Sequence, residues 1–406
     1  MLRQVLLKFL HLLKESFLAV LDNLFYFLSF LIRKDKNLWL FGSMFGNGYA
    51  DNSKYFFKYI CAKHPEIRAI WYSANADVVT SLRQQGYEAY RFYQPRGIVL
   101  ALRAKVAVVS HSLVRDIRPF AFTPAVVLVN LWHGIPLKKI ALDDKVSELR
   151  NKPILQPLQW LSRLLCPGFR RQADVLIAAS AEDQRHFSTA FSFPSEKISI
   201  TGYPRNDVFF RSRAADETAR MKKGIYVPTF RGKENSSFDF FAQFGFNVAA
   251  VDQRLAELNV RLYLKLHHFN FPSREIQQAI RAAKNIFFYE KLDAYEDLPD
   301  FDFLITDFSS IYFDFLLADK PIIFAPFDKP GFEGTVRQLY YDYDEVTPGP
   351  KAQSWPQVLE CIAEVLQNAQ PYAEKLNRTR ARFHRYVDGH SCERVYDEVQ
   401  SLLLAR

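Results

Sequence analysis

The sequence predicts an α/β protein of two domains, each a doubly wound parallel sheet with helices on both faces. The first observation is size, because 406 residues with 49% apolar content can bury two cores. The second is an alternation of short apolar runs with helix-like segments along both halves, which is typical of parallel sheets with crossover helices. The third is a polar, charged stretch at Arg211–Lys223, which indicates a linker. We therefore place one domain at residues 36–212 and a second at residues 213–406.

The first 35 residues differ in composition from the rest of the chain. They are rich in Leu and Phe, but the longest uninterrupted apolar stretch, Leu24–Ile32, is far shorter than the ~20 residues that a membrane-spanning helix needs. Basic residues lie at both ends, and no small-residue cleavage site follows, so a secretory signal is not expected. We expect residues 1–35 to form an amphipathic helical segment on the inner face of a membrane. The alternative is a hydrophobic hairpin packed on the globular body or on another subunit.

The elements of the first half follow in order. A strand is expected at Asn37–Phe41, then a Gly-rich turn, a helix from near Asp51 and a helix at Asp77–Gln85. Further strands are expected at Arg68–Ser73, Lys105–Ser110, Ala125–Leu131, Asp174–Ala179 and Ile198–Ile200. In the second half, strands are expected at Gly224–Val227, Arg261–Leu266, Ile286–Tyr289, Phe301–Thr306 and Pro321–Ala325. Because ligands of such folds bind beyond the carboxyl ends of the strands, we expect functional residues in the strand-end loops, facing a cleft between the domains.

The charge balance favours a polyanionic partner. There are 53 basic and 44 acidic residues, a net charge of +9, which suits phosphate-rich substrates or an anionic membrane surface. Nucleic acid is not supported, because no basic stripe interleaved with aromatic residues occurs on one element. The four cysteines form no CxxC pair, which fits a reduced cytosolic protein. Two acidic pairs have DxD spacing but no other ligand candidates nearby, so no metal and no cofactor are expected.

The most informative motif follows the apolar run Phe301–Ile305. There the chain reads Thr-Asp-Phe-Ser-Ser and then continues as a helix-like segment, which places Ser309 and Ser310 at a helix N-terminus. Unpaired N–H groups at such an end favour an anion, and two hydroxyls can add donors to a phosphate. The alternative is an ordinary helix cap.

Three other strand-end loops carry candidate residues. His133, followed by a glycine after the strand Ala125–Leu131, is placed to take a proton from a hydroxyl nucleophile, although it also fits an ordinary turn. Arg205, in a turn after a strand, could hold a phosphate bidentately or form a surface salt bridge. Lys265 and His267 share one side of their strand, which suits a pyrophosphate.

Six sequence blocks in a fixed order carry a family resemblance: FGSMFGNGYADNSKYFFKYI, LWHGIPLKK, TGYPRND, YVPTFR, KLHH and TDFSSIYFDFLLADKPIIF. Over about residues 37–400 the chain resembles the CDP-glycerol glycerophosphotransferase family, the teichoic acid primases and polymerases and their relatives in capsule synthesis. The resemblance implies a GT-B-like fold, in which two Rossmann-like domains, one for the acceptor and one for the CDP-linked donor, face a cleft. It also implies an amphipathic membrane-binding N-terminus, and we expect the last helix to pack back on the first domain.

The resemblance also implies roles for single residues. His133 would be the general base, and His267, with Lys265 nearby, would bind the pyrophosphate and stabilise the leaving phosphate. Asp314 would face the glycerol or ribose hydroxyls. His268 stands where relatives commonly have Pro, which leaves open which imidazole faces the site. The residues implied to bind the donor are Gly134, Ile135, Pro136, Leu137, Arg205, Pro228, Thr229, Arg231, Lys265, Ser309, Ser310 and Asp314.

The implied reaction is attack of an acceptor hydroxyl on the β-phosphorus of a CDP-polyol such as CDP-glycerol, with release of CMP, in teichoic acid or capsule-type polymer synthesis. The acceptor would be a lipid-linked glycan or a polyol-phosphate chain, and the enzyme would sit peripherally on the cytoplasmic face of the cell membrane. Two alternatives stay open from the residues. One is a GT-B glycosyltransferase that uses a sugar nucleotide, since fold alone does not fix the donor. The other is a non-catalytic membrane-associated scaffold.

Overall fold

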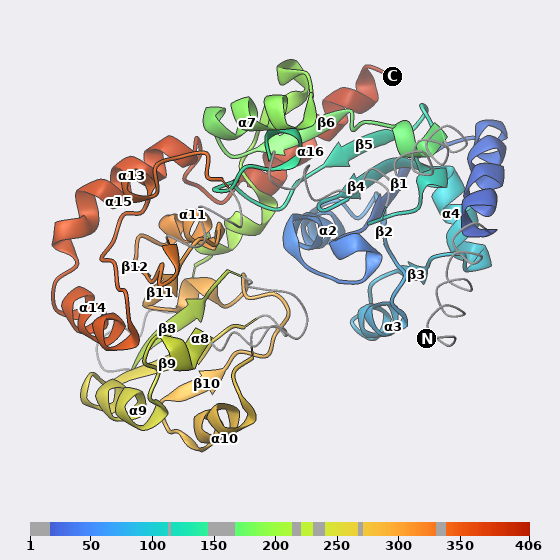
Figure 1. Cartoon of the computed structure of the whole chain (residues 1–406). Coiled ribbons are helices and arrows are strands. Elements are labelled where there is room, and N and C mark those ends of the chain that lie inside the picture. Colours follow the sequence, from blue (N-terminus) through green and yellow to red (C-terminus); the bar gives the residue numbers. More distant parts are fainter. Residues whose placement is uncertain are drawn as a thin grey trace, which may run out of the picture.

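The computed structural model describes residues 17–112, 115–144, 167–212, 221–229, 240–266, 271–329 and 338–406. Two all-parallel sheets form the molecule, as the sequence predicts (Figure 1). We call the part built on the first sheet, up to residue 212, the N-terminal lobe, and residues 221–383 the C-terminal lobe. The position of the domain boundary between them stays a prediction.

The N-terminal lobe contains a seven-stranded sheet of order β3-β2-β1-β4-β5-β6-β7. The predicted strands are present, and β3 is a short edge strand that the sequence reading missed. The strands are β1 (Asp35–Phe41), β2 (Arg68–Ser73), β3 (Ala89–Arg91), β4 (Ala104–Val109), β5 (Val127–Asn130), β6 (Val175–Ala178) and β7 (Ile198–Ile200). The main helices are α2 (Asp51–Lys63), α3 (Ala76–Gln84), α4 (Pro95–Arg103) and α7 (Ala181–Phe191), and the 3-10 helix η8 (Pro204–Phe210) follows β7.

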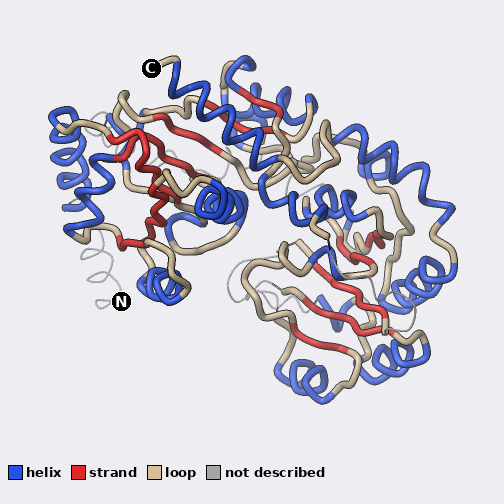
Figure 2. The backbone as a smooth tube through the Cα atoms, turned by 180° about the vertical axis from the view of Figure 1, so that it is seen from behind, coloured by secondary structure: helices blue, strands red, loops and turns tan. Residues whose placement is uncertain are grey.

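The C-terminal lobe contains a five-stranded sheet of order β10-β9-β8-β11-β12. Its strands are β8 (Lys222–Val227), β9 (Val260–Leu264), β10 (Ile286–Phe288), β11 (Phe303–Thr306) and β12 (Ile322–Phe324). Its helices are α8 (Phe240–Gln243), α9 (Val248–Glu257), α10 (Arg274–Ala282), α11 (Ile311–Phe315), α13 (Tyr343–Val346), α14 (Trp355–Gln367) and α15 (Gln370–Phe383). The last helix, α16 (Ser391–Leu404), returns to contact β5 and α2 of the N-terminal lobe, as the view from behind shows (Figure 2).

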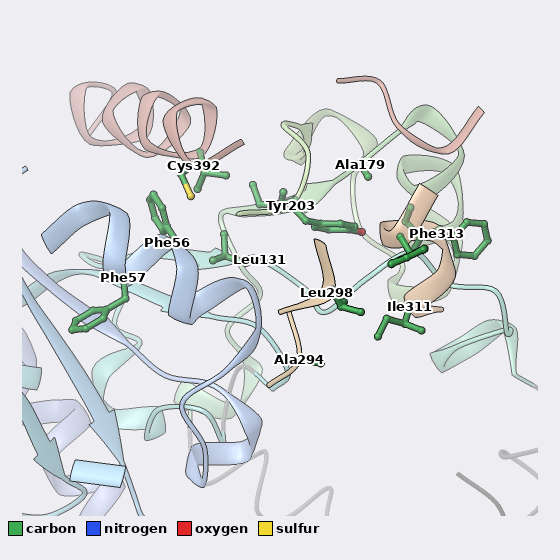
Figure 3. Packing of buried hydrophobic residues seen from close by; sticks show 14 of the residues in the cluster. Phe56, Phe57, Leu131, Ala179, Tyr203, Ala294, Leu298, Ile311, Phe313 and Cys392 are labelled. Carbon is green, nitrogen blue, oxygen red and sulfur yellow. The ribbon is translucent and has the colours of Figure 1, made fainter. Parts of the chain in front are cut away.

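Both sheets are covered on both faces, so their strands are apolar on both sides. In β1, Trp39 and Phe41 belong to one buried cluster and Leu38 and Leu40 to another, because alternate side chains of a strand point to opposite faces. The first of these clusters continues into the C-terminal lobe. Figure 3 shows it, with Leu131 and Tyr203 from one lobe near residues of the other, such as Leu298. The lobes therefore share an apolar core beside the carboxyl ends of their strands.

The described part of the N-terminal segment is a helix at residues 17–28, which lies beside α4 (Figure 1). Its inner face is fixed to the lobe, because the buried carboxylate of Asp22 forms an ion pair with Arg118 and accepts a hydrogen bond from Tyr93 Oη at 2.8 Å. Residues 1–16 lie outside the described residues. Among the described helices, none is long and apolar enough to cross a membrane.

Candidate active site

The base loop, defined as residues 131–137, begins where β5 ends and carries His133. Two residues of this loop have a positive φ, Trp132 at 52° and Gly134 at 128°, so the chain turns sharply on both sides of the histidine. Asn52, fully buried on α2, holds the loop by donating to the carbonyl oxygens of Leu131 at 3.2 Å and Trp132 at 2.9 Å. The loop is thus fixed by side-chain hydrogen bonds and not only by its own turn.

The hydrogen bonding of His133 shows which of its nitrogens is basic. Its Nδ1 lies 3.1 Å from the carbonyl oxygen of Ser110. Because a carbonyl oxygen can only accept, Nδ1 carries the proton in the neutral ring and Nε2 is the basic nitrogen. Burial lowers the pKa of His133 to about 4, with a further contribution from nearby His111. The imidazole is therefore neutral near pH 7, the form that a general base requires.

Two residues beside His133 were missed by the sequence reading. His111 stacks on the His133 ring with centroids 4.7 Å apart, and its Nε2 lies 3.5 Å from Oδ2 of Asp51. His111 accepts a hydrogen bond from the backbone N–H of Met44 at Nδ1, at 3.3 Å, so its proton is on the nitrogen that faces Asp51. The signal for His111 was present, since Ser110-His111-Ser112 follows a predicted strand directly. The signal for Asp51 is its position directly after the Gly-rich turn, where the sequence predicts only the start of a helix.

Arg205 does not take the position that was expected of a free phosphate clamp. Its side chain is buried, with 3% of the residue exposed, and its Nη1 donates to Oδ1 of Asp51 at 2.7 Å and to the carbonyl oxygen of His133 at 3.0 Å. Nη2 donates to Oδ2 of Asp314, in the C-terminal lobe, at 2.5 Å. The guanidinium also lies 4.3 Å from the ring centre of Tyr295. Both terminal nitrogens of the Arg205 guanidinium are thus bound to protein carboxylates. This buried arrangement is neither the expected phosphate clamp nor the alternative surface salt bridge.

Asp314 is likewise placed differently from the expectation that it faces glycerol or ribose hydroxyls. It is fully buried and accepts hydrogen bonds from Arg205, from Nδ2 of Asn206 at 2.9 Å and from Oη of Tyr295 at 2.7 Å. The reason is that every residue of the short helix α11 is buried, so that this helix has no solvent-facing side. Asp314 therefore joins the lobes from inside.

Ser309 and Ser310 lie in the turn between β11 and α11, with Ser310 at the N-cap position as predicted. Both are half-buried, and the Ser310 side chain makes no capping hydrogen bond. Within the described part of the chain, neither hydroxyl has a hydrogen-bond partner, so both are free to donate to a ligand. A Cβ built on Gly134 would lie 3.7 Å from Oγ of Ser310, so this turn meets the base loop of the other lobe.

The remaining predicted donor-binding residues are only partly brought together. Thr229, after Pro228 at the end of β8, donates its backbone N–H to Oδ1 of Asp307 at 2.7 Å, which ties the β8 loop to the loop that carries the serines. Lys265 donates instead to the carbonyl oxygens of Lys291 at 2.8 Å and Leu292 at 2.9 Å. Burial lowers its pKa.

The part of the base loop after Gly134 is buried in the core. Ile135, Pro136 and Leu137 are buried, and the side chains of Ile135 and Leu137 belong to the shared apolar core, so the expectation that they line the donor site does not hold for these two side chains. The carbonyl oxygen of Leu137 accepts a hydrogen bond from the N–H of Tyr340 at 2.9 Å, which pairs this segment with the C-terminal lobe.

His267, His268 and Arg231 lie outside the described residues, so their roles stay predictions. In the described ranges no three side chains gather as metal ligands, and metal independence also stays a prediction.

Comparisons with known proteins identify the family of the chain. Residues 24–401 match the model of the family described as CDP-glycerol:poly(glycerophosphate) glycerophosphotransferase. The chain is 26% identical over 382 residues to a teichoic acid glycerol-phosphate transferase of Staphylococcus aureus, covering 89% of this chain and 92% of that protein. It is 24% identical over 392 residues to a teichoic acid poly(glycerol phosphate) polymerase of Bacillus subtilis, covering 89% of this chain but only 48% of the polymerase.

Solved structures show the same fold. The wall teichoic acid polymerase TagF superposes with a TM-score of 0.75 at 24% identity, with 98% of each chain covered. A UDP-N-acetylglucosamine 2-epimerase from Listeria monocytogenes superposes with a TM-score of 0.53 at 11% identity, covering 92% of this chain and 98% of the epimerase. The predicted GT-B-like α/β fold with parallel sheets is thus confirmed.

Proposed function

Because the chain belongs to the CDP-glycerol:poly(glycerophosphate) glycerophosphotransferase family, we propose that it transfers glycerol phosphate, or a related polyol phosphate, from a CDP-polyol to an acceptor hydroxyl. The acceptor is a membrane-linked glycan or a polyol-phosphate chain in teichoic acid or capsule-type polymer synthesis. The observation that carries the proposal is that the base loop with His133, whose Nε2 is basic, meets the turn with the free Ser309 and Ser310 hydroxyls.

The proposed reaction needs positioning and charge stabilisation more than covalent catalysis. The acceptor oxygen forms a bond to the β-phosphorus of the CDP-polyol as the bond to the bridging oxygen breaks and CMP leaves. The proton of the acceptor hydroxyl passes to Nε2 of His133 and from there to solvent. Hydroxyl and backbone donors of the Ser309–Ser310 turn stabilise the phosphate oxygens as their charge develops. His267 and Lys265 are proposed, from the sequence resemblance, to support the leaving phosphate.

We also propose that the protein attaches peripherally to the cytoplasmic face of the membrane. The helix at residues 17–28 and the turn after it present an outward stripe of exposed apolar side chains, while Asp22 and Tyr26 hold the inner face on the lobe. These side chains recur at helical spacing, which gives one apolar face. The stripe consists of Phe17, Val20, Leu24, Phe27, Leu28 and Leu31, with exposed fractions of 40–85%.

The experiment that tests the proposed reaction is nucleotide release by the purified full chain, measured as CMP from a CDP-polyol and as UDP from a UDP-sugar. CDP-glycerol, CDP-ribitol and a UDP-sugar are offered in turn with a lipid-linked disaccharide acceptor, and His133→Gln is the matched control. CMP release from a CDP-polyol by the wild-type protein, and its loss in the variant, supports the proposal. Turnover of the UDP-sugar alone supports the glycosyltransferase alternative, and no turnover of any donor supports the scaffold. No structural observation favours either alternative, and the family match supports neither.

A further inference from the structure

We propose that Arg205 is a positioning residue that fixes the base loop of the N-terminal lobe relative to the donor-binding turn of the C-terminal lobe. This inference rests on the proposed function and extends it to a residue that touches no substrate. Asp314, Asp51 and Tyr295 are the groups through which Arg205 acts.

The contacts of Arg205 reach three segments that the reaction must hold together. Nη1 donates to the carbonyl oxygen of His133 and to Asp51 on α2, and both distances are within 3.0 Å. Nη2 donates to Asp314 on α11, one turn after Ser310. The backbone N–H of Arg205 donates to Oδ1 of Asn52, the residue that also holds the base loop, at 3.1 Å. One planar fork therefore connects the base to the helix that starts at the donor-binding serines.

The surroundings of Arg205 leave no room for direct contact with a ligand. The base loop covers one side, since a Cβ on Gly134 would lie 2.5 Å from Nη2, and the Tyr295 ring lies against the guanidinium. With 3% of the residue exposed, the side chain is enclosed by protein. A buried pair of this kind is costly to break from one side, because the partner charge is left without compensation. The position of Arg205 inside the site, and not a contribution of the ion pair to the stability of the fold, supports a role in catalysis.

Arg205 also sets the charge around His133. The titratable and charged groups that face His133 are His111 from the loop after β4, Asp51 from α2 and Arg205 from η8. Asp51 is shared, because one of its oxygens accepts from Arg205 and the other lies 3.5 Å from His111. Removing the positive charge of Arg205 ends its repulsion of a protonated His133 and takes the ion-pair partner from Asp51, and both effects favour a protonated His133.

Two variants of Arg205 separate position from charge. Arg205→Gln removes the charge, and Arg205→Lys keeps it but loses the fork. The readouts are kcat and KM for CMP release from CDP-glycerol over a range of pH, and titration of the His133 imidazole by NMR. We expect Arg205→Gln to lower kcat by about 10- to 100-fold, since small misplacements near the reacting atoms have effects of this size, with a much smaller change in the donor KM. The acid limb of kcat/KM and the titration of His133 both move to higher pH. Arg205→Lys lowers kcat with both pH features unmoved.

The outcomes are distinct. If Arg205→Gln raises KM with kcat and the acid limb unchanged, Arg205 contacts the donor and the inference is wrong. If it loses activity only in proportion to unfolded protein, its role is structural and the inference is also wrong. Should that variant not fold, the isosteric Asp314→Asn removes the charge that pairs with Arg205 in the C-terminal lobe and leaves the contacts of Arg205 with Asp51 and the base loop, and it must lower kcat at unchanged donor KM. If the wild-type protein releases no CMP, the proposed function fails, whereas an unmoved His133 titration in Arg205→Gln contradicts the present inference independently of turnover.

Discussion

His111 and His133 stack at neighbouring strand ends with ring centroids 4.7 Å apart and ring planes only 6° from parallel. Two imidazoles this close resist carrying two positive charges, and burial of His133 acts in the same direction. The pKa of His133 is lowered to about 4 by burial first and by His111 second, while Asp51 opposes the shift.

The first prediction concerns pH. A base with a lowered pKa is neutral above that value, so activity falls only as acidification protonates His133, near pH 4. We expect kcat/KM for CMP release to stay level from about pH 6 to about pH 8, where an unperturbed histidine would show a limb near its ordinary pKa. In His111→Phe, which keeps a flat ring without a charge, the acid limb moves to higher pH. A wild-type limb near the ordinary histidine pKa would contradict this assignment.

The second prediction concerns the base itself. His133→Gln keeps a polar side chain of similar reach but provides no basic nitrogen. We expect transfer to fall by about 10²- to 10⁴-fold, the range that general-base catalysis contributes. Calorimetric affinity for CDP-glycerol and the thermal unfolding midpoint should change little, because His133 has only one side-chain hydrogen bond to a described residue, to the Ser110 carbonyl. Substantial turnover in this variant would show that another group accepts the proton.

The third prediction concerns the two serines. Their hydroxyls have no partner within the described part of the chain, so truncation should not destabilise the fold. We expect Ser309→Ala with Ser310→Ala to weaken CDP-glycerol binding by about 1 kcal/mol per lost hydrogen bond, with the thermal midpoint unchanged. Ser354→Ala is a matched control, since Ser354 is also a half-buried N-cap without a side-chain capping hydrogen bond, at the start of α14. Equal donor affinity in the double variant and the control would remove the serines from the site.

Much of the fold could be predicted from the sequence, because it depends on local patterns. Apolar runs fall at the strands, and Ser309 and His133 were found because polar residues directly follow such runs. A short edge strand such as β3, three residues long, has too little pattern to detect. The N-terminal helix could be expected to be amphipathic, but not that Asp22 would pair with Arg118, 96 positions along the chain.

The roles of Arg205 and Asp314 could not be predicted for the same physical reason. They are 109 positions apart, and which carboxylate a buried arginine meets is decided by the packing of one lobe on the other. An arginine suits a phosphate clamp and an aspartate suits a hydrogen bond to a ligand hydroxyl. The residue types alone therefore favoured contact with a ligand over contact with each other. The sequence predicts a helix-like segment around Asp314 but not that all five residues of this helix are buried.

The fourth prediction uses a pair of glycines. Gly134 has φ +128°, and a Cβ there would lie 2.5 Å from Arg205 Nη2, whereas Gly86 has φ +85° with nothing within 4 Å of a Cβ. Both Gly→Ala changes introduce backbone strain of about 1 kcal/mol or more, but only Gly134→Ala displaces Arg205. We expect Gly86→Ala to lower the unfolding free energy and keep full kcat, and Gly134→Ala to lower both. Equal kcat in the two variants would show that the close approach of Gly134 to Arg205 does not matter for turnover.

The last prediction concerns membrane attachment. Deleting the N-terminal helix is a poor test, because Tyr26 is buried and the Phe25 and Phe120 ring centroids lie 5.5 Å apart. Deletion would therefore uncover the core of the lobe.

Substitution of the outer face avoids this problem. Leu24→Ser with Phe27→Ser removes two side chains that are 53% and 59% exposed, and Leu404→Ser, at an 89% exposed position on α16, is the control. Since interfacial binding scales with buried apolar area, we expect the double variant to sediment less with phosphatidylglycerol vesicles than the wild type or the control. CMP release with a soluble acceptor analogue should stay unchanged, because the helix lies away from the base loop. If the double variant sediments like the wild type, the stripe does not hold the protein on the membrane.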